Sequence, residues 1–384
     1  MGKLSVPANQ EEKMDIIPFF KLMVDRSASD LFFSVGTPPQ MKVEGITAPI
    51  GEQPMSSQQM SEIAASIMND SQRKEFESTM ELNMAISVDG IGRYRINIFR
   101  QRGEVAMVVR YIKGSIPSIE NLNLPPVLKT VVMEQRGLVL VVGSTGSGKS
   151  TTLASMIDYR NTNFTGHILT IEDPIEYVHL HKKSIVDQRE IGIDTLSYDN
   201  ALQNAMREAP DVVLIGEIRE KNTMKHAIAY AETGHLCLST LHANNANQTL
   251  DRVINFFTEE ARQQFLLDLS LNLRAIISLR LIPGLQAKLV PAVEVLLNSP
   301  YISDLIDKGK IEDIKEAMSR SNEQGMQTFD QALFDLYRSG KISKENAIKY
   351  ADSRNNVSLK IRLTEEGAQD KDSGLSISPN DNER

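Results

Sequence analysis

Nine consecutive residues are of the types that hold a chain of phosphates. They read Gly-Ser-Thr-Gly-Ser-Gly-Lys-Ser-Thr and fit the G-x(4)-G-K-[ST] template of a phosphate-binding loop. Glycines lack Cβ atoms, so the backbone N–H groups of such a loop can turn toward phosphate oxygens. The pattern predicts a site for a nucleoside triphosphate with Mg²⁺. The predicted binding residues are Gly143, Ser144, Thr145, Gly146, Ser147, Gly148, Lys149, Ser150 and Thr151.

The segments on either side of this loop are those that the template requires. An apolar run at 138–142 predicts a strand before it, and 151–159 predicts a helix whose N-terminus points at the anion. We expect Lys149 to reach the β- and γ-phosphates and the hydroxyl of Ser150 to ligate Mg²⁺.

A second apolar run, 211–216, ends in an acidic residue. Glu217 follows it and has the position of a Mg²⁺ ligand, either directly or through water. The common pattern places an aspartate directly before this glutamate, whereas Gly216 occupies that place here.

A third apolar run, 167–172, leads into Glu-Asp-Pro-Ile-Glu. Carboxylates at the carboxyl end of a parallel strand lie where ligands bind in open α/β sheets, and one of them can orient or deprotonate the attacking water. The spacing alone does not choose among Glu172, Asp173 and Glu176.

Two histidines flank a fourth apolar run, 236–241. His235 and His242 differ by an odd number of positions, so a regular strand places them on opposite faces and a shared metal site is not expected. Taken alone, a histidine at a strand end is more often a structural hydrogen-bonding group than a catalyst.

The four apolar runs alternate with helical segments, which predicts an α/β domain with a parallel sheet buried on both faces. After Asn247 the pattern predicts mainly helices, including a long amphipathic one at 261–281. A strand or hairpin arm is expected at 288–297, and 358–363 alternates weakly.

The N-terminal part mixes helical and alternating segments. Helices are expected at 14–26, 57–68 and 71–78, and strands at 29–35, 41–43, 84–88, 94–99 and 106–112. We therefore divide the chain into a disordered extension (1–13), an α+β domain (14–112), a proline-rich linker (113–126), an α/β domain with C-terminal helices (127–363) and a disordered acidic tail (364–384).

Composition limits the class of protein. A length of 384 residues suggests two or three domains, and 41% apolar content supports real cores. The net charge is −8, of which six acidic and two basic residues in the tail contribute −4. This argues against nucleic acid as a partner.

A single cysteine, Cys237, excludes an intrachain disulfide, and no apolar run has the length of a membrane span or a signal-peptide core, so we expect a cytoplasmic protein.

Five motifs taken together resemble the secretion and type IV pilus ATPase family. They are the phosphate loop at 143–151, Thr-Ile-Glu-Asp-Pro-Ile-Glu-Tyr at 170–177, Ile-Gly-Glu-Ile-Arg at 215–219, Ala-Glu-Thr-Gly-His-Leu at 231–236 and Ser-Thr-Leu-His-Ala-Asn-Asn-Ala at 239–246. They follow the order of the family, and the resemblance covers about residues 14–363. Gln-Gly-Met-Gln-Thr-Phe-Asp-Gln-Ala-Leu at 324–333 resembles the retraction branch of PilT/PilU type, and the polar tail resembles that of PilU.

The resemblance implies a PAS-like first domain followed by a RecA-like P-loop ATPase domain with a C-terminal helical region. It implies a ring of six subunits that hydrolyses ATP with Mg²⁺, in a cleft between the two domains, to do mechanical work. The residues that it implies are Glu176 as general base, Glu217 as Walker B acid, His235 and His242 as the His box, and Arg95 and Arg110 as first-domain arginines that reach the phosphates. The expected partners are a PilT-type retraction ATPase and the inner-membrane pilus platform protein, at the cytoplasmic base of the pilus.

One stretch departs from the PilT pattern. PilT proteins carry Ala-Ile-Arg-Asn-Leu-Ile-Arg-Glu where residues 300–308 of this chain read Pro-Tyr-Ile-Ser-Asp-Leu-Ile-Asp-Lys, without either arginine. This indicates an accessory to a PilT-type motor. One alternative is an assembly or type II secretion ATPase, whose typical tetracysteine zinc module cannot be built from Cys237 alone. Another is a nucleotide-binding regulatory subunit with little turnover, against which the intact Lys149, Glu176 and Glu217 argue.

Overall fold

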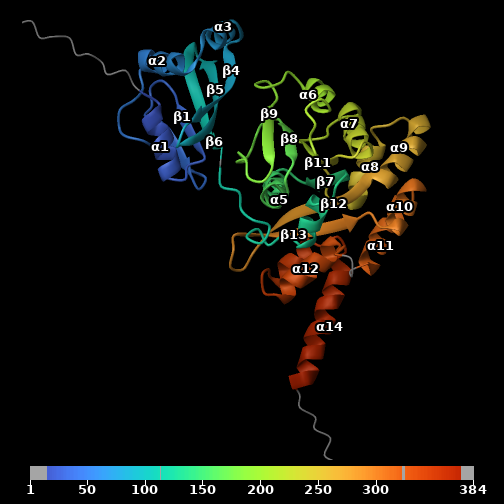
Figure 1. The fold of residues 1–384 in the computed structure, drawn as a ribbon. Helices are drawn as coiled ribbons and strands as arrows, with labels where there is room; N and C mark the ends of the chain where they lie inside the picture. The colour runs from blue at the N-terminus through green and yellow to red at the C-terminus, as the bar shows by residue number, and fades with distance from the viewer. Residues whose placement is uncertain (1–14, 113, 322–324, 373–384) are drawn as a thin grey trace, which may run out of the picture. The chain divides into compact units, whose positions relative to one another are not determined.

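The computed structural model describes residues 15–112, 114–321 and 325–372, with the positions of side chains up to residue 366. The chain divides into two compact units. The first comprises the residues up to Ser115 together with Ile175–Val178 and Gly192–Asp194, and the second comprises the rest. Figure 1 shows the elements of both units. The predicted extension, 1–13, lies outside the described residues.

The first unit is an antiparallel sheet with three helices. The strand order is β3-β2-β1-β6-β5-β4. The strands are β1 (Asp30–Phe33), β2 (Gln40–Val43), β3 (Ile46–Pro49), β4 (Glu81–Val88), β5 (Gly92–Gln101) and β6 (Glu104–Ile112), and the helices are α1 (Ile17–Asp25), α2 (Ser57–Ile67) and α3 (Asp70–Thr79). The predicted helices and strands of this part are confirmed. β3 was not predicted, because its four residues are all exposed and lack the alternation of a half-buried strand.

Alternation along β5 determines which face of this sheet is buried. Tyr94, Ile96 and Ile98 are fully buried, and the ring of Tyr94 stacks on Phe20 of α1 with 4.0 Å between centroids. The Tyr94 hydroxyl donates a hydrogen bond to the backbone oxygen of Phe20 at 2.9 Å. Burial, with a smaller contribution from Tyr111, raises the pKa of Tyr94 to about 12, so this phenol stays a donor at neutral pH.

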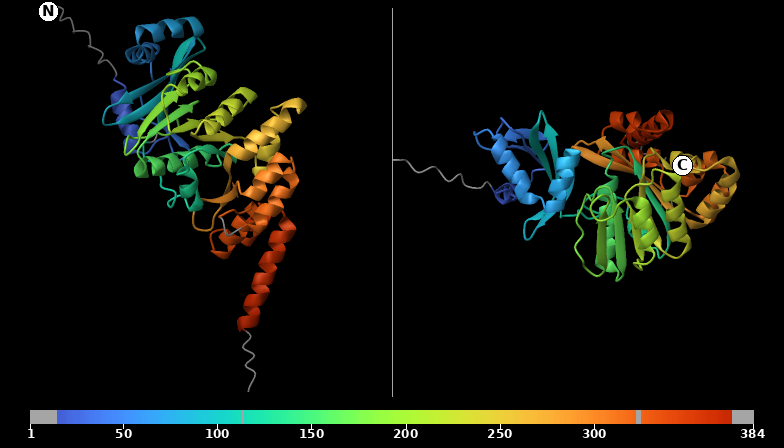
Figure 2. Two further views of the ribbon diagram at one scale, coloured as in Figure 1. Left: turned by 45° about the vertical axis from the view of Figure 1, so that its right-hand side comes forward. Right: turned by 90° about the horizontal axis from the view of Figure 1, so that it is seen from above.

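The second unit is built on a seven-stranded sheet of order β13-β12-β7-β11-β10-β8-β9. Every neighbouring pair is parallel except β12 with β13. The strands are β7 (Gly137–Gly143), β8 (His167–Glu172), β9 (Ile185–Glu190), β10 (Val212–Ile215), β11 (Leu236–Leu241), β12 (Leu273–Pro283) and β13 (Leu289–Leu297). The predicted α/β class is therefore confirmed for this unit, as Figure 2 shows from two further sides.

Helices cover both faces of this sheet. Leu138, Leu140 and Val142 of β7 belong to one buried cluster, whereas Val139 and Val141 belong to another. The first cluster contains residues of α6 (Tyr198–Ala205), α7 (Lys221–Glu232), α8 (Ala246–Ile254), α9 (Glu259–Asn272), α10 (Pro300–Asp307) and α11 (Ile314–Arg320), and the second contains residues of α4 (Val127–Val132) and α5 (Lys149–Asn163). Because successive side chains of a strand face opposite sides, an entirely apolar strand is what two covered faces require.

The second unit differs from the predictions in three places. The helix expected at 261–281 ends with α9 at Asn272, and the chain continues as β12, which pairs with β7 and β13. The edge strand β9 was not predicted, since four of its six residues are polar. The weakly alternating segment 358–363 is helical, within α14 (Arg354–Asp372), so the predicted tail also begins as helix. Residues 373–384 lie outside the described part of the chain.

The outer strand β13 is covered by the chain that enters α12 (Phe329–Arg338). Val295 and Gln327 exchange two backbone hydrogen bonds, of 2.8 and 3.0 Å, and the Gln327 side chain donates to the oxygen of Val293 at 2.7 Å. Val357 and Ile361 of α14 are fully buried in a separate small cluster with Phe329 and with α13 (Lys344–Lys349). The C-terminal helices thus have a core of their own beside the sheet.

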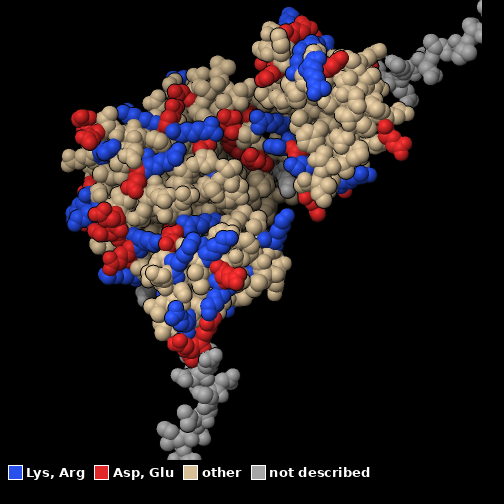
Figure 3. Space-filling model, turned by 180° about the vertical axis from the view of Figure 1, so that it is seen from behind, with Lys and Arg blue, Asp and Glu red and all other residues tan. Residues whose placement is uncertain are grey.

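The surface carries charges of both signs. On the face drawn in Figure 3, basic and acidic side chains of the second unit are interspersed rather than gathered into a field of one sign. None of the helices in the described ranges combines the length and apolar character that crossing a bilayer requires.

The buried amide of Asn161, in the last turn of α5, generates a stability prediction. It donates to the oxygen of Leu180 at 2.7 Å and accepts from the backbone N–H groups of Lys182 and Ser184 at 3.1 and 3.3 Å. We expect Asn161→Ala to lower the free energy of unfolding by about 2 kcal/mol, because the Leu180 oxygen loses its bond and the N–H groups of Lys182 and Ser184 keep only longer backbone bonds, of 3.3 and 3.4 Å. Urea titration measures this. Asn163→Ala, which removes only an exposed bond to Tyr159, is the control, and an equal effect of the two variants would contradict the prediction.

Candidate nucleotide-hydrolysis site

The predicted phosphate loop connects the buried strand β7 to α5. Gly143 has φ +152° and Gly148, directly before α5, has φ +95°. A Cβ atom at Gly143 would collide with the Ser147 hydroxyl and lie 2.7 Å from the backbone oxygen of Leu279. Only glycine fits at this close approach of β7 and β12. The loop therefore has the conformation in which backbone N–H groups surround an anion at a helix N-terminus.

Lys149 is held within the loop. Its ammonium donates hydrogen bonds to the backbone oxygens of Gly143 and Ser144 at 2.9 and 3.0 Å. Burial lowers the pKa of Lys149, and the negative charge of Glu217 acts in the opposite direction. An ammonium has three protons, so one is left for a phosphate oxygen. The lysine is thus oriented before any ligand binds.

Two serines of the loop fit the group that the template predicts. The hydroxyl of Ser147 is buried and has no hydrogen-bond partner among the described residues, so it can donate to a bound phosphate. Ser150, in the first turn of α5, is exposed and could ligate Mg²⁺. These observations fit a nucleoside triphosphate with its metal.

Glu217 lies on the same edge of the sheet. It follows β10, and parallel pairing of β7, β11 and β10 places the ends of all three strands on that edge. Its carboxylate is mostly buried and accepts from Arg219 Nε at 2.7 Å, and His242 Nε2 lies 3.1 Å from its other oxygen. The structure therefore brings together the phosphate loop, the predicted metal ligand and one of the two predicted histidines.

Gly216, the departure from the common acidic pattern, has a steric explanation. A Cβ atom there would lie 2.9 Å from the Tyr198 hydroxyl, 3.2 Å from Cα of Glu172 and 3.3 Å from the oxygen of Ile171. Burial, followed by the charges of Asp173 and Glu172, raises the pKa of Tyr198. The protonated hydroxyl of Tyr198 thus occupies the space that an aspartate side chain at position 216 would require.

The three predicted candidates for the base differ in their surroundings. Glu172, at the end of β8, accepts hydrogen bonds from Thr170 at 2.7 Å and Gln188 at 3.3 Å. Asp173 and Glu176 are exposed. Bonds within the sheet hold Glu172, so it is less available to attract a proton from water than an exposed carboxylate is.

The two predicted histidines lie at opposite ends of β11. His242 follows the carboxyl end, whereas the backbone oxygen of His235 accepts from Gly137 at the start of β7. The six residues of β11 between them span roughly 20 Å at ~3.3 Å each. His235 Nδ1 is 3.1 Å from the Thr233 hydroxyl and 3.2 Å from the Tyr230 oxygen, which is a structural environment. The structure does not bring His235 to the phosphate loop of its own chain.

Arg95 and Arg110 lie in the first unit. They stand directly opposite each other on β5 and β6, and Arg110 also faces Asp30 of β1, to which its Nε donates at 2.8 Å. The two guanidinium groups thus share one face of the sheet.

Sequence reasoning did not pair Arg219 with Glu217 and did not place Tyr198 at the site. The spacing of Arg219, two residues after Glu217, is compatible with an ion pair, and Ile-Gly-Glu-Ile-Arg contains both. Tyr198 comes from α6, distant in sequence from β10, so no local signal could have placed it at Gly216.

Comparisons with known proteins agree with this arrangement. A family profile described as "Type II/IV secretion system protein" matches residues 56–373. The chain belongs to this family. It is 52% identical over 363 residues to the type IV pilus ATPase PilU of Pseudomonas aeruginosa, covering 94% of this chain and 95% of that protein. It is 42% identical over 334 residues to the type IV pilus retraction ATPase PilT of the same organism, covering 87% and 97%.

A solved structure extends the agreement to the fold. The crystal structure of the pilus retraction motor PilT with bound ADP superposes with a TM-score of 0.82 at 38% identity, covering 88% of this chain and 98% of that one. Within the family the chain is therefore of the PilT/PilU type, and the resemblance expected from the five motifs is confirmed.

The packing at Gly216 generates a second prediction. We expect Gly216→Asp, which restores the common acidic pair, to lower the thermal midpoint by several degrees and to reduce ATP turnover, because the new side chain displaces Tyr198. Differential scanning fluorimetry and a phosphate-release assay measure these effects. Gly114→Ala is the matched control, since nothing lies within 4 Å of the added methyl group. Wild-type stability and turnover of Gly216→Asp would show that the site has room for an aspartate.

Proposed function

We propose that this chain is an ATP-hydrolysing motor that powers type IV pilus retraction, as an accessory to a PilT-type motor. The observation that carries the proposal is the common edge of the sheet where the phosphate loop, Glu217 and His242 meet, in a chain of the PilT/PilU type. A phosphate-loop enzyme needs little covalent chemistry from its side chains, so positioned cations and acids are the machinery to expect.

Each group at this edge has a task that its surroundings support. Lys149, held by two loop carbonyls, presents its remaining proton to the β- and γ-phosphates. Ser150 and Glu217 would hold Mg²⁺, which neutralises charge that develops on the phosphates. His242 and Arg219 fix the Glu217 carboxylate. Glu176, exposed and distinct from the hydrogen-bonded Glu172, is proposed as the base that orients water.

Other parts of the proposal rest on the family resemblance. The first unit is proposed to be PAS-like and the second RecA-like, with six subunits in a ring. His235, Arg95 and Arg110 are proposed to contribute to the site. The working place is proposed to be the cytoplasmic base of the pilus, against the inner-membrane platform protein and beside a PilT-type ATPase.

The accessory role is supported by α10. Ile302, Leu305 and Ile306 are buried, so the fold of this helix is secured from its inner face. Asp304 and Asp307 are exposed, and Lys308 pairs with Asp304 at 2.7 Å. Acids on an exposed helix, where PilT has arginines or other residues, alter partner choice more than fold.

A test of the chemistry separates Glu172, the last residue of β8, from Glu176, which follows that strand. We expect Glu176→Gln to bind ATP but lose turnover by about a hundredfold or more, because the amide fills the same space without accepting a proton. Glu172→Gln should retain most turnover, and Lys149→Ala should lose both turnover and affinity, since it removes the cation facing the phosphates. Binding is measured with a fluorescent ATP analogue and turnover by phosphate release. Normal hydrolysis by Glu176→Gln together with loss in Glu172→Gln would move the base to Glu172, and normal hydrolysis by Lys149→Ala would contradict the ATP site.

A test in cells addresses the accessory role. In a strain without its PilT-type partner, this chain should give no robust pilus retraction, whereas with the partner it should increase the force of retraction. Retraction under load in an optical trap measures both, with Lys149→Ala as the inactive control. Strong retraction without the partner would make the protein a stand-alone motor, and retraction unaffected by its deletion would favour the assembly or regulatory alternatives.

A further inference from the structure

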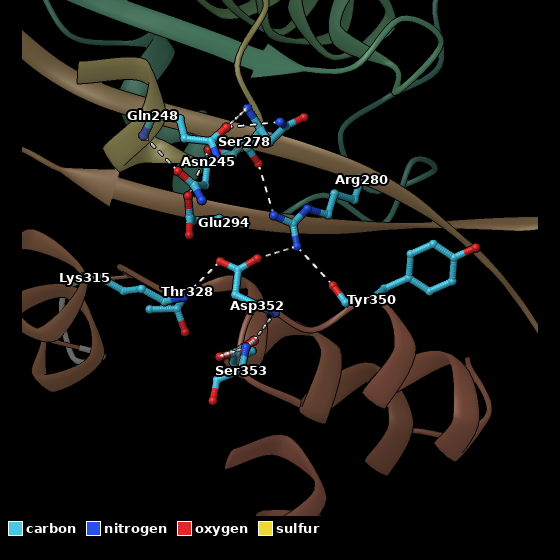
Figure 4. Close-up of polar contacts among 12 residues, drawn as sticks. Asn245, Gln248, Ser278, Arg280, Glu294, Lys315, Thr328, Tyr350, Asp352 and Ser353 are labelled. Atoms are coloured by element: carbon cyan, nitrogen blue, oxygen red, sulfur yellow. Dashed lines mark hydrogen bonds and ion pairs between the residues drawn. The ribbon is translucent and has the colours of Figure 1, made fainter. Parts of the chain in front are cut away.

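A polar cluster connects the loop after His242 to the C-terminal helices. Figure 4 shows Arg280 of β12 at its centre, with Asp352 and Tyr350 on one side and the chain leading to Asn245 on the other. All of these residues belong to the second unit. None of them takes part in the chemistry assigned above.

Arg280 is placed beside the phosphate loop by strand register. The preceding residue, Leu279, pairs with Gly143, and its backbone oxygen is one of the atoms that leave no room for a Cβ there. One position further along β12, the Arg280 side chain donates to the oxygen of Asn244 at 3.3 Å. Asn244 is two residues beyond His242, whose imidazole contacts Glu217.

The other donors of Arg280 point to the C-terminal helices. Nη1 donates to the Tyr350 oxygen at 3.0 Å and pairs with Asp352 at 2.7 Å, and the guanidinium lies over the ring of Phe329 with 3.8 Å to the centroid. Lys315 of α11 pairs with the second oxygen of Asp352 at 2.9 Å. Burial alone would raise the pKa of Asp352, but the hydrogen bond from Lys315 and the charge of Arg280 outweigh it and lower that pKa, so the carboxylate is charged.

A second tether holds the next turn of the same loop. Glu294 of β13, almost fully buried, accepts the backbone N–H of Ala246 at 2.7 Å and the Ser278 hydroxyl at 3.0 Å. The segment 242–246 is therefore held at two points, by Arg280 of β12 and by Glu294 of β13, and Arg280 also contacts the C-terminal helices.

We propose that Arg280 is a positioning residue for ATP hydrolysis. It holds the loop after His242 in the conformation in which His242 contacts Glu217, and through Asp352 it makes that conformation depend on the packing of the C-terminal helices. The inference rests on the proposed function, since it assigns a use to the contact of His242 with Glu217. A guanidinium is required because its planar fork can serve the Asn244 oxygen, the Tyr350 oxygen and the Asp352 carboxylate together, whereas an ammonium on a flexible stem cannot.

Three variants test the proposal. Arg280→Lys keeps the charge but loses the fork, and Asp352→Asn keeps the shape but loses the charge that anchors Arg280. Glu365→Gln is the control: it removes an exposed ion pair with Lys344, 2.6 Å long, between α13 and α14, without contact to the loop. We expect kcat to fall about tenfold in Arg280→Lys and about threefold in Asp352→Asn, with KM changed less than ~2-fold, and no change in Glu365→Gln.

Two further measurements separate positioning from a merely structural role. Hydrogen exchange of the backbone amides of residues 244–248 should be faster by about tenfold in Arg280→Lys, while α5 is unaffected. In a His242→Ala background, Arg280→Lys should lower kcat by less than ~2-fold, because both act through one loop. If His242→Ala leaves no measurable turnover, the exchange measurement decides.

The outcomes that overturn the proposal are distinct from failure of the proposed function. Turnover and exchange of Arg280→Lys and Asp352→Asn equal to those of Glu365→Gln would overturn it. The proposal would also be overturned if both variants had a much lower thermal midpoint while the amides of residues 244–248 exchanged no faster than global unfolding allows. Arg280 would then be only a structural residue. Normal hydrolysis by Lys149→Ala contradicts the ATP site itself, and the exchange measurement, which needs no turnover, still tests the tether.

Discussion

Parallel pairing of β7, β11 and β10 is the constraint on which the rest of the second unit depends. It brings the ends of three strands to one edge, so that residues separated by up to a hundred positions in sequence can act together. The pairing requires strands that are apolar on both faces, and this in turn requires helices on both sides. The positions of the phosphate loop, Glu217 and His242 follow from that arrangement, since each belongs to the first polar segment after its strand.

The antiparallel hairpin of β12 and β13 both completes the sheet and holds the loop after β11. It closes one side of the core and also carries Arg280 and Glu294, which hold the loop after β11. The C-terminal helices rest on the same hairpin through a small core of their own. The helices at the end of the chain thereby contact the loop after β11 through the Arg280 side chain of β12.

The sequence predicted the elements that have a strong local signal, and failed where tertiary contacts decide. The phosphate loop and the strand before Glu217 were predictable because template and apolar run coincide. The segment after Leu273 was predicted as helix because a buried strand and a buried helix are both apolar and periodicity does not distinguish them. The steric role of Tyr198 at Gly216 depends on α6 packing against β10, which no spacing reveals. The distance between His235 and His242 follows directly from the length of β11, although the family resemblance groups both residues in one His box.

The cover on β13 has a consequence for how this protein behaves at high concentration. A bare outer strand exposes a row of N–H and C=O groups that can template pairing with another molecule. Here the backbone of Gln327 pairs with both the N–H and the oxygen of Val295, and its side chain donates to the Val293 oxygen, so these groups of β13 are not open to such pairing. At the opposite side, four of the six residues of β9 are polar and three of these are charged, which disfavours intermolecular sheet extension. Both features lower the tendency of this protein to aggregate through the edges of its own sheet.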